Sequence, residues 1–119
     1  MGKPDYSIYM IRALLEGYSE LEQGKIPYAK FIEYGVRIEK SSSSLVHLAS
    51  ILKADIDRGI RFALKPTEKL ILITWLAHGV TIEQCSYWIG CDTVETKHIE
   101  LKAVKKMYQF LNYGSENKA

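Results

Sequence analysis

Apolar residues recur at helical spacing along most of this chain. In residues 6–21 the apolar positions at steps of three and four are Ile8, Ile11 and Leu15. That spacing places side chains on one face of a helix. Residues 26–40 predict a second helix, in which Pro27 fits only the first turn. Because no stretch gives a convincing strand, the pattern predicts an all-α fold of five to six helices.

Four serines at residues 41–44 mark the clearest break in composition. Helical spacing resumes immediately afterwards, at Leu45, Leu48, Ile51, Leu52 and Ile56. Serine is a favoured N-cap, so Ser44 is expected to cap this helix and the other serines to connect. The break divides the chain into a helical arm over 1–44, a domain over 45–112 and a polar tail over 113–119.

Residues 66–111 carry the strongest local signals, and they predict three consecutive helices. Pro66 fixes a helical φ at a position whose N–H would in any case lack a partner. The first helix is therefore expected over residues 66–78, ending at Gly79. It has too many apolar residues for a solvated strip and should be almost entirely buried. These residues are Leu70, Ile71, Ile73, Trp75 and Leu76.

Two capping signatures follow. Thr81 with Gln84 predicts a short helix that ends at Ile89, with Gly90 in the left-handed conformation that closes helices. Asp92 with Glu95 repeats the signature and begins a helix that runs to about residue 111. Its inward stripe is expected to be Leu101, Val104, Tyr108 and Leu111. Helices joined by so tight a turn are typical of a helix-turn-helix, with the last as the recognition helix.

Residues 54–111 resemble the fourth region of bacterial sigma factors and the sigma-like regulators of phages. The resemblance is carried by the Ile89-Gly90 pair and by the run Ala103-Val104-Lys105-Lys106-Met107, with Ser86 where the family usually has a small alanine. It implies a carboxyl-terminal helix-turn-helix that binds promoter DNA. With a short helical arm ahead of it, the chain looks most like phage late transcription regulators such as the ArpU and RinA families.

Two positions depart from the family pattern. Pro66 lies one position later than the family places it, and Glu100 stands where a core leucine is expected. A buried, unpaired carboxylate costs several kcal/mol. Either the helix register differs here or the packing around Glu100 is altered.

The resemblance makes the amino end of the last helix the part that enters the major groove. Residues expected there to face base edges are Thr93, Glu95, Thr96, Lys97 and His98. Lysines available for phosphates are Lys97, Lys102, Lys105 and Lys106, and the supporting helix offers Thr81 and Gln84. For the polar residues the alternative is helix capping, and for the lysines it is a solvated helix face.

Aromatic residues are concentrated in the arm. Tyr6, Tyr9, Tyr28, Phe31 and Tyr34 are candidate partner-binding residues, because aromatic side chains are favoured at protein interfaces. The alternative is that they pack on the carboxyl half. Trp75 and Trp88 are expected in the core, although an exposed Tyr87-Trp88 pair would indicate a partner contact.

Charge and composition restrict the possibilities further. Sixteen basic and fourteen acidic residues leave a net charge of +2, which favours nucleic acid only modestly. Cys85 and Cys91 lack the neighbours of a zinc or redox motif and are expected to be reduced, in a cytoplasmic protein. His47, His78 and His98 are too dispersed for a metal set. No cofactor, metal or enzymatic activity is expected, and no membrane span of ~20 residues occurs.

Two hypotheses about the function fit these observations best. The first is a sequence-specific DNA-binding transcription regulator, encoded by a phage or prophage, that binds promoter DNA as its partner through the helix over residues 92–111. Its arm would form a homodimer or contact RNA polymerase. The second is a sigma-like interaction module that binds RNA polymerase or a sigma factor without recognising DNA. A role in DNA packaging, like that of small terminase subunits, also stays open.

Overall fold

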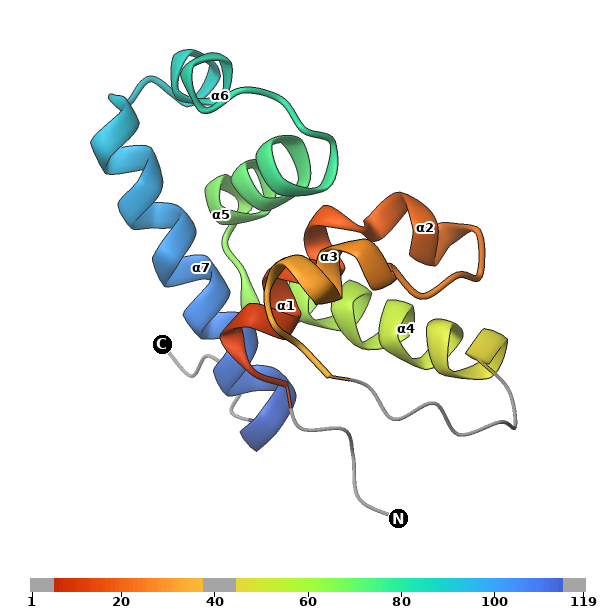
Figure 1. Ribbon diagram of the computed structural model, residues 1–119. Helices are drawn as coiled ribbons and strands as arrows, with labels where there is room; N and C mark the ends of the chain where they lie inside the picture. The colour runs from red at the N-terminus through yellow and green to blue at the C-terminus, as the bar shows by residue number, and fades with distance from the viewer. Residues whose placement is uncertain (1–5, 38–44, 115–119) are drawn as a thin grey trace.

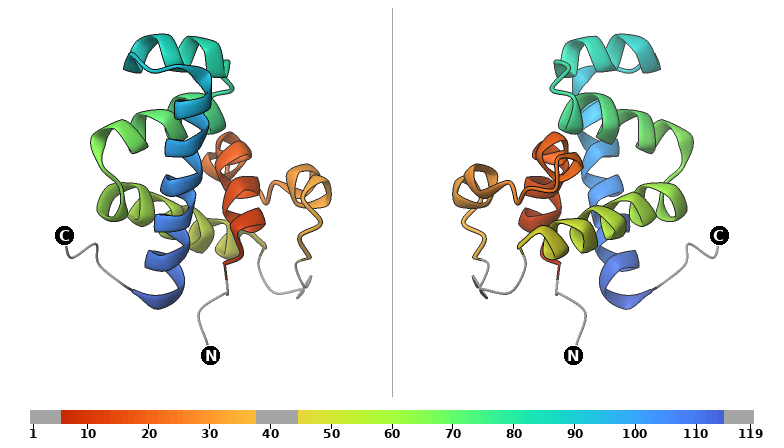
Figure 2. Two further views of the ribbon diagram at one scale, coloured as in Figure 1. Left: turned by 90° about the vertical axis from the view of Figure 1, so that its left-hand side faces the viewer. Right: turned by 90° about the vertical axis from the view of Figure 1, so that its right-hand side faces the viewer.

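The computed structural model describes residues 6–37 and 45–114. These residues form helices and no strand, which confirms the all-α prediction. The helices are α1 (Ile8–Glu16), α2 (Tyr18–Glu22), α3 (Tyr28–Glu33), α4 (Leu45–Ala63), α5 (Pro66–Ile71), the π-helical segment η1 (Leu72–Ala77), α6 (Ile82–Ile89) and α7 (Thr93–Tyr113). The long helices α4 and α7 cross each other, α1 lies against both, and α6 lies across the amino end of α7 (Figures 1 and 2).

The amino-terminal helices are shorter than the sequence predicts. The helix expected over residues 6–21 breaks at Gly17 into α1 and α2. A Cβ at residue 17 would overlap the ring of Pro27, so only glycine allows the following segment to pack this closely. The helix expected over residues 26–40 ends at Tyr34, because Gly35 adopts a left-handed φ of 69°. These breaks give more helices than the predicted five to six.

One hydrophobic core joins the arm to the rest of the chain. α1 contributes Ile11, Leu14 and Leu15, all without exposed surface, and these pack with buried residues of α4, η1 and α7. α4 and α7 approach closely at Gly59, where a Cβ would lie 2.9 Å from Met107 Cε. The serine connector and its predicted N-cap, Ser44, fall outside the described residues. The core therefore crosses the boundary that the sequence suggests between arm and domain.

Tyr6 ties the start of the described chain to the end of α7. Its backbone N–H donates to Asn112 Oδ1 (2.8 Å) and its carbonyl accepts from Asn112 Nδ2 (2.7 Å). Its hydroxyl donates to Asp55 on α4 (2.6 Å). Burial, and then this bond to a carboxylate, raises the pKa of Tyr6 above its usual range. Tyr6 thus connects α1, α4 and α7.

The Pro66 segment starts and stops as predicted, but its helix changes type. α5 gives way at Leu72 to η1, where the N–H of His78 bonds the carbonyl of Ile73, five residues back. The segment ends before Gly79, whose φ is 70°. The expectation of almost complete burial is wrong for Leu70, which is 39% exposed. None of the helices in the described ranges is both long and apolar enough to cross a membrane.

Candidate nucleic-acid interface

The turn between α6 and α7 is built by local capping, as the sequence predicts. Thr81 accepts a hydrogen bond from the backbone N–H of Gln84 (3.1 Å) and begins α6. Gly90 ends that helix with a left-handed φ of 78°. Asp92 Oδ1 then accepts from the N–H of Glu95 (2.7 Å) and begins α7. Each cap satisfies an N–H that the first turn of a helix leaves without a partner.

A buried hydroxyl pair sets the position of α6 on α7. Ser86 Oγ and Thr96 Oγ1 lie 2.7 Å apart, and the Thr96 hydroxyl also lies 2.9 Å from the carbonyl of Asp92. A carbonyl only accepts, so Thr96 donates to Asp92 and accepts from Ser86. The Thr96 side chain has no exposed surface. The prediction that it faces a base is therefore wrong.

The inward face of α7 differs from the predicted stripe. Its buried residues are Thr96, Glu100, Ala103, Val104, Met107 and Leu111. Leu101 was expected among them but is 47% exposed, and Tyr108 is only half-buried. Val104 and Leu111 are buried as predicted, but Glu100 takes the inward position in place of its neighbour Leu101, so the buried face departs from the predicted register at this level of the helix. We call the side that carries the buried set the inner face of α7.

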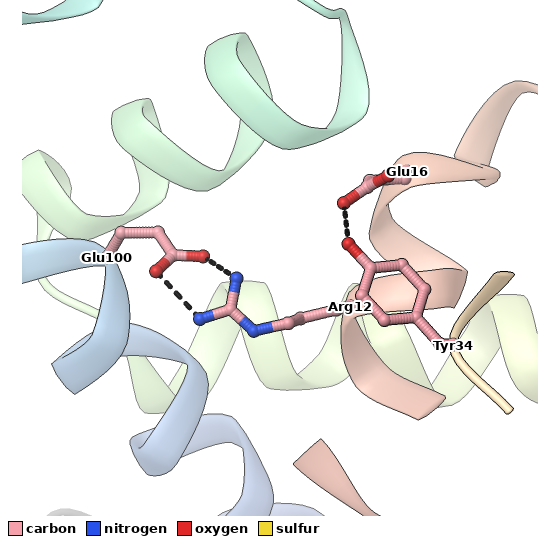
Figure 3. Close-up of polar contacts among 4 residues, drawn as sticks. All are labelled: Arg12, Glu16, Tyr34 and Glu100. Carbon is pink, nitrogen blue, oxygen red and sulfur yellow. Dashed lines mark hydrogen bonds and ion pairs between the residues drawn. The ribbon is translucent and has the colours of Figure 1, made fainter. Parts of the chain in front are cut away.

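Arg12 explains why a glutamate lies on the inner face. Its guanidinium, from α1, meets both carboxylate oxygens of Glu100, with Nη2 to Oε1 at 2.8 Å (Figure 3). The Glu100 side chain is only 3% exposed and that of Arg12 is 18% exposed. Such paired, parallel hydrogen bonds offset the desolvation of the carboxylate. Altered packing around Glu100, one of the two explanations that the sequence allows, therefore accompanies the departure from the predicted register at this position.

The opposite side of α7 is open to solvent. Its exposed residues at spacings of three and four, which we call the outer face of α7, are Val94, Lys97, His98, Leu101, Lys102 and Lys105. None of the three lysines forms an ion pair with a described residue. In the left panel of Figure 2, α7 runs along the side turned toward the viewer, with α6 across its upper end. The outer face therefore presents unpaired positive charge beside the capped turn.

The other residues predicted to contact DNA differ in their exposure. Thr81, Gln84 and Glu95 are exposed, whereas Thr93 is half-buried. Lys106 lies apart from the outer face, because its Nζ bonds the buried carboxylate of Glu68 on α5 at 2.8 Å. The expectation that Lys106 is available for phosphate is corrected accordingly. Thr81 and Glu95 also take part in the two caps, the role that the sequence left as the alternative.

The arm aromatics pack mainly against their own chain. Tyr6 and Phe31 are each 2% exposed, so neither side chain reaches a partner. The prediction that these two residues bind a partner is therefore wrong. Tyr28 and Tyr34 pack against the core, and the Tyr34 hydroxyl donates to Glu16 (Figure 3). Burial, and then this bond, raises the pKa of Tyr34. Among the five residues, only Tyr9 is largely exposed, at 63%.

α6 carries an exposed aromatic pair. Tyr87 is 81% exposed and Trp88 is 53% exposed, so Trp88 does not lie in the core as expected. Trp75 does pack against the core. The sequence signal for the exception was the adjacency of the two rings on a helix whose buried positions are Cys85 and Ser86. On α7, Val94 and Leu101 are also exposed, which the sequence pattern did not predict.

Cys91 follows Gly90 in the capped turn, where desolvation and the charge of Glu95 act on its thiol. Desolvation, and then the negative charge of Glu95, raises the pKa of Cys91, so its thiol stays protonated at neutral pH. Within the part of the chain that the structure describes, no three His, Cys, Asp or Glu residues gather in a way that would hold a metal ion. No known family model matches the chain, and comparisons with curated proteins and with solved structures find no match either.

Proposed function

We propose that this protein is a sequence-specific DNA-binding transcription regulator that inserts the outer face of α7 into the major groove. The observation that carries the proposal is the set of unpaired lysines on that face, next to a turn closed by two caps. An α-helix fits the major groove, and the residues near its amino end are those that reach base edges. The sequence resemblance to sigma region four supports promoter DNA as the target and a phage or prophage as the source.

The individual residues have separable roles in this proposal. Lys97 and His98 lie near the amino end of α7, where they would contact base edges, and Val94 would contact a thymine methyl group. Lys102 and Lys105 lie further along the helix and would contact phosphates, which position the protein without selecting a sequence. Thr81 and Gln84 are exposed at the amino end of α6 and would contact the backbone of the adjacent strand.

Binding to random and genomic duplex DNA at two salt concentrations tests the proposal, with enriched sites selected in the same experiment. The native protein should lose affinity steeply as salt rises, because each neutralised phosphate releases counterions. Lys97→Glu with Lys102→Glu should abolish measurable binding. Lys25→Glu with Arg37→Glu is the matched control, since these exposed basic residues of the amino-terminal segment give the same change in net charge outside α7. Absence of salt-dependent binding by the native protein would exclude the proposal.

A second candidate is an interaction module that binds RNA polymerase or a sigma factor without recognising DNA. The exposed Tyr87-Trp88 pair favours it, because tyrosine and tryptophan dominate the energetics of protein interfaces. Glu83 is exposed one turn before Tyr87, so this side of α6 is acidic as well as aromatic. Capture of purified RNA polymerase holoenzyme should then survive Lys97→Glu with Lys102→Glu. It should be lost in Tyr87→Ala with Trp88→Ala, which would leave DNA binding largely intact under the first candidate.

A further inference from the structure

A cavity of about 350 Å³ lies between α2, α4 and the α5–η1 segment. Its apolar wall is formed by Ile60, Ile73 and Ala77, all of which keep some exposed surface. Ligand sites are usually concave, mostly apolar and at least about 300 Å³ in volume, with a few convergent polar groups. The cavity thus has the size and apolar lining of a small-molecule site, away from the outer face of α7.

The charged residues of this cavity are unequally compensated. Asp57 accepts from the hydroxyl of Tyr18 and pairs with Lys53 Nζ at 2.8 Å, so its negative charge is balanced. Arg61 and Lys69 also line the cavity, and neither forms an ion pair with a described residue. The cavity therefore combines an apolar wall with two uncompensated cations, which together favour an anion with an apolar body.

The part of the cavity wall that η1 forms has an unusual backbone conformation. Ile73 and Ala77 belong to η1, where π-helical hydrogen bonds replace the α-helical pattern. Short π segments inside helices cost stability and are frequent at functional sites. Just after η1 ends at Ala77, the N–H of Val80 bonds the carbonyl of Thr74, six residues back (3.0 Å). This backbone feature is independent of the charges, and it forms the same wall.

Two larger cavities fit a ligand less well. One, of about 550 Å³, includes Glu16 and Lys30, but their charges already pair with each other at 3.2 Å. The other, of about 610 Å³, lies beside Tyr9 and Tyr113 and has no charged side chain in its lining. Neither therefore offers uncompensated charge together with an apolar wall.

We propose that the cavity between α2, α4 and η1 binds a small amphipathic anion, whose apolar body packs on Ile60, Ile73 and Ala77 and whose acidic group pairs with Arg61 and Lys69. Arg61 is exposed, and its guanidinium lies 5.2 Å from the centroid of the Phe62 ring. It can therefore swing toward a ligand without breaking an ion pair. The inference does not depend on DNA binding, because the ligand contacts no residue of the outer face of α7.

Fluorescence titration of the full-length protein with anilinonaphthalene sulfonate, an apolar anionic dye, tests the inference. We expect saturable binding at one site per chain. Decanoate should displace the dye, whereas decylamine, with the same chain and the opposite charge, should not. Naphthoate in a parallel titration distinguishes a flat aromatic body from a flexible chain.

Variants locate the site. Arg61→Gln with Lys69→Gln should weaken dye binding at least about tenfold, since charge-assisted contacts are lost. Lys25→Gln with Arg37→Gln removes the same charge at exposed positions outside the cavity and should leave binding unchanged. Ala77→Leu should fill the cavity and abolish binding, with circular dichroism and thermal unfolding confirming that the variant is folded. As a second readout, backbone amide NMR shifts on adding decanoate should change most in residues 57–61 and 69–78.

Three results would overturn the inference. They are the absence of saturable binding by the native protein, equal affinities in the native, Gln and Leu proteins, and shift changes confined to another part of the molecule. A dye site beside Tyr9 and Tyr113, for example, would assign the ligand to the larger uncharged cavity instead.

Discussion

The two faces of α7 use polar and apolar residues in opposite ways. The inner face buries Glu100 and Thr96, whereas the outer face exposes Leu101 and Val94. Glu100 and Leu101 are neighbours in the sequence, so simple polarity would place them the other way round. What distinguishes them is the partner: Glu100 meets the guanidinium of Arg12, whereas Leu101 stays 47% exposed.

This difference shows that partners, more than polarity, determine which side of the helix faces inward. Each buried polar group on the inner face has its hydrogen bonds satisfied within the chain, as buried polar groups generally must. The outer face keeps its lysines unpaired and its apolar residues exposed. This exposure is unfavourable in the isolated protein, but it is useful on a surface that binds a ligand. Removing these partners one at a time tests this comparison between the two faces.

Arg12→Ala should have the largest effect on the inner face. It leaves the 3%-exposed carboxylate of Glu100 without its partner, and removing one member of a buried pair costs about 3–5 kcal/mol. Glu100→Leu should cost clearly less, because Arg12 is more exposed and can turn toward water. Arg12→Met combined with Glu100→Leu should recover most of the loss, since an apolar replacement of both partners is often neutral.

Urea unfolding of these variants at neutral pH measures the differences in the free energy of unfolding. If Arg12→Ala proves as stable as the native protein, the buried pair does not determine the register of α7. The order of the two single variants is the sharper result. A larger loss for Glu100→Leu than for Arg12→Ala would mean that the side chain acts by packing and not by charge.

A matched pair of leucines on the same helix compares the faces directly. Leu111 on the inner face is 3% exposed, whereas Leu101 on the outer face is 47% exposed. Leu111→Ala should lower the free energy of unfolding by about 2–5 kcal/mol, as truncation in a core does. Leu101→Ala should change it by about 0.5 kcal/mol or less. Equal losses in thermal and urea unfolding would restore the register that the sequence predicts.

Local signals in the sequence were sufficient for the turn but not for the register. The caps at Thr81 and Asp92 and the left-handed Gly90 depend on residues within a few positions of each other, and the structure confirms all three. The break at Gly17 depends on Pro27, ten residues away, and so escapes a reading of helical periodicity. Glu100 depends on Arg12, 88 residues away, which no local pattern reveals.

The residues predicted to contact DNA divide in the same way, into those that a local pattern places correctly and those whose exposure depends on distant partners. Lys97, Lys102 and Lys105 are exposed as expected, because charged residues at the spacing of a solvated stripe lie outside whichever register holds. Thr96 and Lys106 were misplaced because their exposure depends on partners on other helices, Ser86 and Glu68. Exposure of Trp88 was missed because an apolar aromatic ring is more often buried.

Among the buried polar groups of the inner face, the smallest expected loss concerns the hydroxyl pair between α6 and α7. Thr96→Val removes both the donor to the Asp92 carbonyl and the acceptor for Ser86, leaving a buried hydroxyl donor without a partner. It should cost about 1–3 kcal/mol.

Ser86→Ala should cost less than about 1 kcal/mol, because Thr96 keeps its bond to Asp92 and loses only a hydrogen bond that it accepts. Urea unfolding of both variants, with the double variant to close the cycle, gives the coupling between the two hydroxyls. Equal losses in the two single variants would reverse the assigned direction of the bond, making Thr96 the donor to Ser86. The hydroxyl pair would then still join α6 to α7, but the Asp92 carbonyl would rely on the backbone N–H of Thr96 alone.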